Sequence, residues 1–297
     1  MFYVGKKEGF FERNGINVTS IEIGTGSPDA MRSVGRGQSD FAFGDLPTMA
    51  TADSQGVTDV ALVAVNQRSP MSLCTLGNKH PIHAPGDLKG LTMGLDYKGS
   101  TFIFYKTLMS ANGIPRSAVK ERPVTEPYEN FLLTGKVDAI TCYVDAELPI
   151  IESAARKQNL GPISVVLGAD HGFDALGSGL VTSRKMIQQK PDLVRRFVKA
   201  YMESFRWVMA HPAQAAQIVA DSSPEVKNDA PVFQAQLEAD IKDTFTSPTT
   251  KSNGLGYMSP ESWQATVDTL SKQKVITKAP PVSSLYENSF VQSADGS

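Results

Sequence analysis

The stretch GQSDFAFGDL, residues 37–46, contains a helix end, a strand and a helix start in immediate succession. Gly37 closes a helical pattern, the apolar run Phe41-Ala42-Phe43 follows, and Asp45 stands where the next helix begins. A helix that runs through glycine into a strand and a further helix is typical of α/β folds. The stretch GKVDAI, residues 135–140, repeats the pattern. The repeat favours two similar α/β domains.

On both sides of this stretch, apolar runs of period 2 alternate with helical patterns of period 3.6. This alternation is the signature of βαβ units and predicts mainly parallel sheets flanked by helices. From Pro191 onward the pattern is almost wholly helical, so this tail must cover a sheet formed earlier in the chain. The strands are predicted at residues 17–23, 41–43, 60–65, 71–76, 91–95, 119–124, 137–144, 164–167 and 180–182. We therefore expect a discontinuous first lobe, residues 1–80 and 176–297, and a second lobe, residues 81–175.

Composition excludes several classes of protein. The 297 residues carry a formal net charge of −2, with scattered basic residues, which argues against a nucleic-acid partner. The longest aliphatic run, Val60 to Val65, is far shorter than the roughly 20 residues of a membrane span. The two cysteines, Cys74 and Cys142, allow one disulfide at most, and both are interpreted as small buried hydrophobic residues.

Catalytic, cofactor and metal motifs are weak in this sequence. Gly24-Thr25-Gly26 lacks the third glycine of a dinucleotide-binding fingerprint, and Ser178 does not have the spacing of a nucleophile elbow. His80 and His83 have a spacing that could chelate a metal, but they fit loop histidines on the surface better. We therefore expect no catalytic residue, no metal and no cofactor.

Polar side chains gather at four predicted strand-to-helix corners, where open α/β sheets bind ligands. These corners are residues 24–27, 44–45, 97–101 and 143–147. Helix N-termini suit an anion or a carbonyl oxygen, although plain helix capping is the alternative at any one corner. Arg68 is either a charged anchor for the ligand or a surface ion-pair partner. The candidate ligand-binding residues are Thr25, Ser27, Asp45, Arg68, Tyr97, Ser100, Thr101, Tyr143 and Glu147.

Four segments together carry a resemblance to a known family. They are GKKEGFFERNGINV (5–18), GQSDFAFGD (37–45), PGDLKGLTMG (85–94) and LTGKVDA (133–139). In this order and spacing the chain resembles the periplasmic substrate-binding proteins of bacterial ABC importers, in the branch for nitrate, sulfonates, taurine and thiamine pyrimidine precursors. The chain keeps Tyr143 and Glu147 but lacks the tryptophan that relatives often carry near the first of these.

The resemblance implies a two-lobed, type II flytrap fold that closes on a small organic molecule, either anionic or planar and polar. It also implies a monomer outside the cytoplasm that delivers its ligand to an ABC permease in the membrane. The alternative is an enzyme on the same fold, similar to eukaryotic thiamine-pyrimidine synthases. Those enzymes carry a cysteine-rich cluster and an active-site histidine, which the predicted corners lack.

The start of the chain suggests that a strand is missing. Residues 3–13 are predicted to form a crossover helix that would connect two parallel strands, yet only the second, residues 17–23, is present. The absent strand would lie between the strands at 17–23 and 41–43. We therefore expect the natural gene product to extend upstream by a strand and an export signal.

Overall fold

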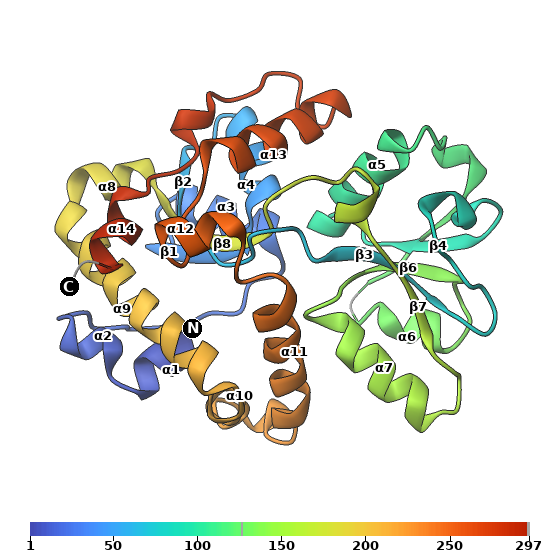
Figure 1. The fold of residues 1–297 in the computed structure, drawn as a ribbon, viewed down its shortest axis with the longest axis horizontal. Coiled ribbons are helices and arrows are strands. Elements are labelled where there is room, and N and C mark those ends of the chain that lie inside the picture. The colour runs from blue at the N-terminus through green and yellow to red at the C-terminus, as the bar shows by residue number, and fades with distance from the viewer. Residues whose placement is uncertain (126, 296–297) are drawn as a thin grey trace.

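The computed structural model describes residues 1–125 and 127–295 and has two lobes, each built on its own β-sheet (Figure 1). Helices cover both sheets, so the chain is mixed α/β, as the alternating pattern predicted. Among the described residues, no helix has the length and apolar character that crossing a membrane requires.

The first lobe contains a three-stranded sheet in the order β1–β8–β2. Both pairings are antiparallel, with β8 in the centre. One face packs on α3, α4 and α13 through a cluster that includes Met31, Met49 and Trp263. The strands are β1 (Phe41–Asp45), β2 (Asp59–Ala64) and β8 (Ser178–Ser183), and the helices on this face are α3 (Ser27–Gly35), α4 (Leu46–Ser54) and α13 (Pro260–Lys272).

The second lobe contains a five-stranded sheet in the order β5–β4–β6–β3–β7. β4 pairs in parallel with β5 and β6, whereas β3 pairs antiparallel with β6 and β7. The strands are β3 (Met71–Leu76), β4 (Thr92–Leu95), β5 (Lys120–Pro123), β6 (Ala139–Tyr143) and β7 (Ile163–Leu167). The helices are α5 (Ser100–Ala111), α6 (Glu129–Leu133) and α7 (Glu147–Lys157), with the 3-10 turns η1 (Pro85–Leu88), η2 (Arg116–Ala118) and η3 (Gly168–His171).

The helical tail packs on the sheet of the first lobe. The apolar stripe of α9 (Pro191–Ala210), which includes Phe197, Tyr201 and Phe205, forms one cluster with Leu62 of β2 and Leu180 of β8. The other elements of this region are α1 (Phe2–Lys7), α2 (Phe10–Arg13), α8 (Arg184–Gln189), α10 (Pro212–Ala220), η4 (Pro224–Val226), α11 (Ala230–Asp243), α12 (Pro248–Asn253), η5 (Val282–Ser284) and α14 (Ser289–Asp295).

Two crossings join the lobes, one between β2 and β3 and the other between β7 and β8. They run against each other: the Ser69 amide donates to the Ala175 carbonyl at 2.9 Å, and the Gly177 amide donates to the Asn66 carbonyl at 3.0 Å. These backbone hydrogen bonds tie the two crossings together at the hinge.

Two expectations about the sheets were wrong. The sheets are not mainly parallel, because β8 inserts antiparallel between β1 and β2, and β3 inserts antiparallel between β6 and β7. β3 also belongs to the sheet of the second lobe, so by sheet membership the chain leaves the first lobe before Met71 and not near residue 80. Apolar periodicity finds strands, but it does not identify their partners.

The strand expected at residues 17–23 is not formed. These residues lie outside every helix and strand and have no ladder partners, and Ile23 is 90% exposed. The crossover helix expected at residues 3–13 is divided into α1 and α2 at Gly9, which adopts a left-handed conformation with φ of 72°. Alternation of apolar side chains is insufficient for a strand when no neighbouring strand pairs with it.

Candidate functional site

A cavity of about 520 Å³ lies between the lobes and is lined from both. Its volume is within the range of small-molecule sites, roughly 300–1,000 Å³. Six of the predicted residues line it, and they come from three of the four corners: Thr25, Ser27, Ser100, Thr101, Tyr143 and Glu147. The fold therefore brings together predicted residues that are far apart in the sequence.

Part of the wall from the first lobe is formed by the start of α3 and by β1. Ser27 opens α3, and its Oγ accepts a hydrogen bond from the Asp45 amide at 3.0 Å, which ties the helix to the end of β1. Thr25 donates from Oγ1 to Asp29 at 3.1 Å. Gly44 packs closely here, because a Cβ at this position would lie 2.6 Å from the end of the Met31 side chain, which would have to shift. The wall therefore exposes small polar groups on a closely packed backbone.

Asp45 does not line the cavity but caps α4. One oxygen, Oδ2, accepts from the Thr48 amide at 2.8 Å and from its hydroxyl at 2.5 Å. The residue is 2% exposed, and burial raises the pKa of its carboxyl to about 6 despite these hydrogen bonds. At this corner the carboxylate caps a helix, which is the alternative to ligand binding that the sequence left open.

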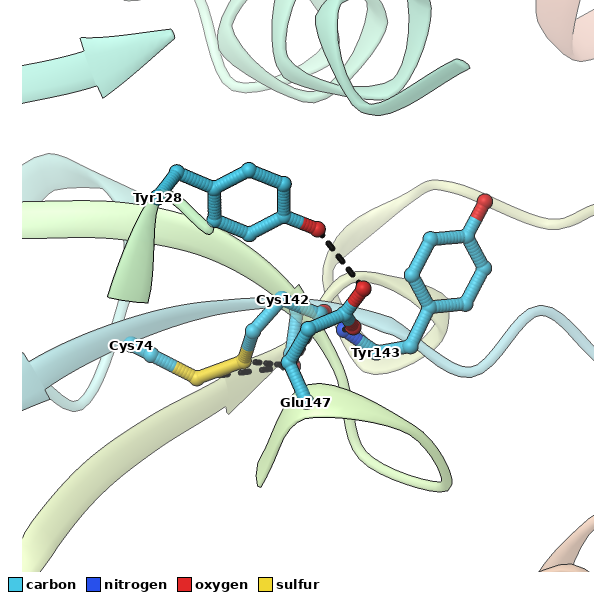
Figure 2. Close-up of a disulfide and its surroundings, with 6 residues drawn as sticks. Cys74, Tyr128, Cys142, Tyr143 and Glu147 are labelled. Atoms are coloured by element: carbon cyan, nitrogen blue, oxygen red, sulfur yellow. Dashed lines mark hydrogen bonds between the residues drawn. A yellow bond between two sulfur atoms is a disulfide. The ribbon is translucent and has the colours of Figure 1, made fainter. Parts of the chain in front are cut away.

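The wall from the second lobe is a hydrogen-bonded network (Figure 2). Glu147, the first residue of α7, accepts from the Tyr128 hydroxyl at 2.7 Å and from the Tyr143 amide at 2.8 Å. Tyr143 lies at the end of β6, and its hydroxyl is 2.8 Å from Ser100 Oγ at the start of α5. Burial raises the pKa of both Tyr143 and Glu147. Both oxygens of Glu147 are thus used to hold the wall in position.

Arg68 and Tyr97 lie away from the cavity lining. Arg68 forms an ion pair with Asp170 at 2.8 Å beside a separate cavity of about 260 Å³. Its side chain is 45% exposed, which fits the surface ion pair rather than the anchor. Tyr97 is 41% exposed, and its hydroxyl donates to Glu121 at 3.3 Å.

Sequence reasoning missed an acidic cluster that spans the two lobes. Asn66, in the first crossing, donates from Nδ2 to Asp145 Oδ2 at 3.2 Å and to Asp240 Oδ1 at 2.5 Å. Asp145 precedes α7 in the second lobe, whereas Asp240 lies on α11 in the first. All three line the cavity. Asp145 falls within a predicted corner, but only the fold brings the other two to it.

The lining combines aromatic side chains with acidic groups. Within the described part of the chain, no Lys, Arg or His contributes to it. The acidic residues are Asp96, Asp145, Glu147 and Asp240. The aromatic residues are Phe2, Phe43, Tyr128, Tyr143, Tyr201 and Phe245. An anionic ligand, one of the two kinds expected, would therefore find no basic side chain in the described lining to pair with. A planar polar ligand would find aromatic side chains to stack on and polar groups to exchange hydrogen bonds with.

Cys74 and Cys142 are buried, as interpreted from the sequence, but they are joined in a disulfide (Figure 2). The bond links β3 to β6 one residue before Tyr143. Neither cysteine lines the cavity, and neither do His80 and His83. In the ranges 1–125 and 127–295 there is also no cluster of three or more His, Cys, Asp or Glu side chains that could hold a metal ion. The groups that the enzyme alternative requires are therefore not in the lining.

Comparison with known proteins supports the two-lobed fold. A family profile described as "NMT1/THI5 like" matches residues 1–215. The riboflavin-binding protein RibY of Chloroflexus aurantiacus is 24% identical over 293 residues, covering 98% of this chain and 81% of that protein.

Two solved structures illustrate the range of the fold. The alkanesulfonate-binding protein SsuA of Xanthomonas axonopodis pv. citri, bound to MOPS, has a TM-score of 0.73 at 14% identity and covers 97% of this chain and 94% of its own. The desulfurization enzyme DSZB, in complex with biphenyl-2-sulfinic acid, has a TM-score of 0.64 at 15% identity and covers 99% and 95%. The architecture is that of periplasmic binding proteins, and an enzyme shares it.

Proposed function

Because the chain belongs to the NMT1/THI5-like family, we propose that it is the extracytoplasmic solute-binding component of an ABC importer. Its ligand is a small, planar, polar organic molecule held between the two lobes. The observation that carries the proposal is the cavity of about 520 Å³, with hydrogen-bonding groups from both lobes and aromatic side chains on its walls. Ligand sites of this kind combine apolar walls with a few polar groups that fix orientation.

The chemistry of the lining favours a planar heterocycle over a sulfonate. Aromatic side chains such as Tyr143 and Phe245 offer faces on which a flat ring can stack. Hydroxyl groups such as Ser27 and Ser100 can exchange hydrogen bonds with ring substituents. A sulfonate keeps its negative charge at neutral pH and would lie among carboxylates without a basic partner. The riboflavin bound by the relative RibY is a planar heterocycle of the proposed kind.

The proposed mechanism is closure of the lobes around the ligand. The paired crossings at Ser69–Ala175 and Asn66–Gly177 form a narrow hinge, and the ligand contacts both lobes only when they are closed. A ligand that binds the closed form more tightly shifts the population toward it. The closed form would then dock transiently, as a monomer, on the membrane permease.

The proposed location outside the cytoplasm has independent support in the disulfide. Cys74 and Cys142 are joined between neighbouring strands, and such bonds persist mainly in oxidising compartments. Family membership and the disulfide therefore favour the same extracytoplasmic location.

Calorimetric titration tests the function. The panel consists of riboflavin, simple pyrimidines, alkanesulfonates including MOPS, and carboxylates. We expect saturable binding of one molecule per chain by a planar heterocycle, with weaker or absent binding by the sulfonates. Thr101→Ala, in the lining, should weaken that binding, whereas Thr134→Ala on the surface should leave it unchanged. Absence of heat across the panel would contradict the solute-binding proposal, and tight binding of the sulfonates would contradict the ligand class.

A further inference from the structure

We propose that Asp145 and Asp240 form a cation subsite that spans the two lobes, so that the ligand is a planar organic cation with a positively charged nitrogen at this end of the cavity. The inference rests on the proposed function, which sets the shape of the ligand but not its charge.

The geometry places both carboxylates around one point. Asn66 Nδ2 donates to Asp145 Oδ2 at 3.2 Å and to Asp240 Oδ1 at 2.5 Å, so one nitrogen atom reaches an oxygen of each. The same elements meet again where Gln236 of α11 donates from Nε2 to the Ala146 carbonyl at 2.6 Å. The subsite is therefore formed only where α11 and the start of α7 come together.

The acidic pair accepts hydrogen bonds, with Asn66 donating to both carboxyls and Thr244 Oγ1 donating to Asp240 Oδ1 at 2.5 Å, but no basic side chain of the described lining balances its charge. Asp145 Oδ1 is shielded from solvent and accepts no hydrogen bond from any described residue. Burial, together with the proximity of the other carboxyl, raises the pKa of Asp145, and burial raises that of Asp240. A buried carboxylate is costly when one of its oxygens has no donor and its charge no counter-ion, and the cost is relieved when the group binds a proton or faces a cation. A ligand cation would supply the missing partner.

The other groups at the cavity reinforce the preference for positive charge. Glu147 is already committed to Tyr128 and Tyr143, and Asp96 accepts from the Lys98 amide at 3.1 Å. The described lining contains no Lys, Arg or His that would compete for the two carboxylates. The aromatic side chains add their ring faces, which attract cations.

Three tricyclic probes of similar shape and different charge separate this inference from the proposed function. They are proflavine, a cation; lumiflavin, which is neutral; and anthraquinone-2-sulfonate, an anion. We expect proflavine to bind roughly tenfold more tightly than lumiflavin and anthraquinone-2-sulfonate to bind most weakly. If lumiflavin or the sulfonate binds as tightly as proflavine, the cation subsite is wrong although the solute site stands. If none of the three binds, the proposed function is contradicted and the subsite with it.

Variants assign the effect to the two carboxylates. Asp145→Asn and Asp240→Asn should each weaken proflavine binding roughly tenfold and change lumiflavin binding less than about threefold. Glu238→Gln is the matched control, because it removes a negative charge from an exposed position on α11 and should leave both affinities unchanged. Thermal unfolding of each variant verifies the fold, and the two independent positions guard against the loss of one variant. Unchanged proflavine affinity in a folded Asp145→Asn or Asp240→Asn variant would overturn the proposal.

Discussion

Glu147 shows how one residue organises a binding wall. Its carboxylate holds the Tyr128 hydroxyl and the Tyr143 amide at the same time. In Glu147→Gln one of these donors would face the amide NH₂ group, so we expect the ligand affinity to fall roughly tenfold with the fold retained. Calorimetry measures the loss, and Glu152→Gln, exposed on the same helix, serves as the control. An unchanged affinity in Glu147→Gln would show that the network does not position the ligand.

The buried carboxyl of Asp59 should make the free energy of unfolding depend on pH. It lies at the start of β2 with 0% exposure, and neither of its oxygens has a hydrogen-bond partner among the described residues. Burial and the nearby Asp53 carboxyl raise the pKa of Asp59 to about 7, and burial raises that of Asp53 to about 7. The folded pKa values exceed the unfolded ones, so the contribution of this pair to stability should be greatest below about pH 4 and should be lost as the pH rises from about 4 to 7.

Asp59→Asn tests this prediction because it removes one of the two charges. At pH 8 the variant should be more stable than the parent by about 1–3 kcal/mol, and the difference should shrink at pH 5. Thermal unfolding at the two pH values measures it. Asp243→Asn, an exposed carboxylate on α11, is the control for a general charge effect. A stability difference that does not depend on pH would contradict the explanation.

Much of the candidate site could be predicted from single residues and their neighbours. Side chains from three corners line one cavity, and two of these corners, residues 97–101 and 143–147, lie where a helix begins after a strand, a feature that sequence spacing records. Arg68 could not be assigned, because its partner Asp170 lies 102 residues away. Asp240 was missed for a similar reason: the cavity receives it from α11, which is 174 residues from Asn66. Contacts of this kind depend on how the lobes are joined.

At the level of the elements, the disulfide fixes β3 to β6 beside the ligand-facing Tyr143. Cys74 and Cys142 are 68 residues apart, and closing such a loop typically contributes about 2–4 kcal/mol. The double variant Cys74→Ala, Cys142→Ala should lose stability of that size in denaturant unfolding, as should the reduced parent. Without reductant, the denatured parent should resist alkylation. Labelling of both thiols would contradict the disulfide.

The central strand β8 depends on a glycine for its close contact with β2. A Cβ at Gly179 would lie 2.4 Å from the Val63 carbonyl oxygen. Gly179→Ala should therefore destabilise the protein by about 1–3 kcal/mol or prevent its folding. Gly86→Ala is the matched control, because a Cβ there has open space around it. Equal unfolding midpoints for the two variants would show that β8 tolerates the displacement. Gly177, on the other side of Ser178, is also closely packed, because a Cβ there would lie 2.9 Å from the Arg68 carbonyl oxygen.

Strand identity was predictable from the sequence, but sheet topology was not. The apolar runs predicted eight of the strands that form, including the wholly buried β2 and β3. The pairing depends on the two crossings between the lobes. β3 follows the first crossing and joins the sheet of the second lobe, and β8 follows the second crossing and joins the sheet of the first lobe. Because of this exchange both sheets contain antiparallel pairs. The run at residues 17–23 pairs with no strand of either sheet in the described structure.

The two lobes should close on each other when the ligand binds. The cavity is lined from both lobes, and α11 of the first lobe contacts the start of α7 of the second. A solute in the cavity would therefore contact both lobes and hold them together. Closure would reduce the radius of gyration, and small-angle X-ray scattering with and without ligand measures that change. An unchanged radius at saturating ligand would contradict closure as the response to binding.

Hydrogen exchange followed by mass spectrometry locates the bound solute on the chain. The protein is compared with and without the strongest binder from calorimetry. The claim that the solute lies between the lobes predicts increased protection in residues 24–27 of the first lobe and in residues 143–147 of the second, at the same ligand concentration. Residues 169–176, beside the Arg68 cavity, should change less. Protection confined to one lobe, or centred on residues 169–176, would contradict the account.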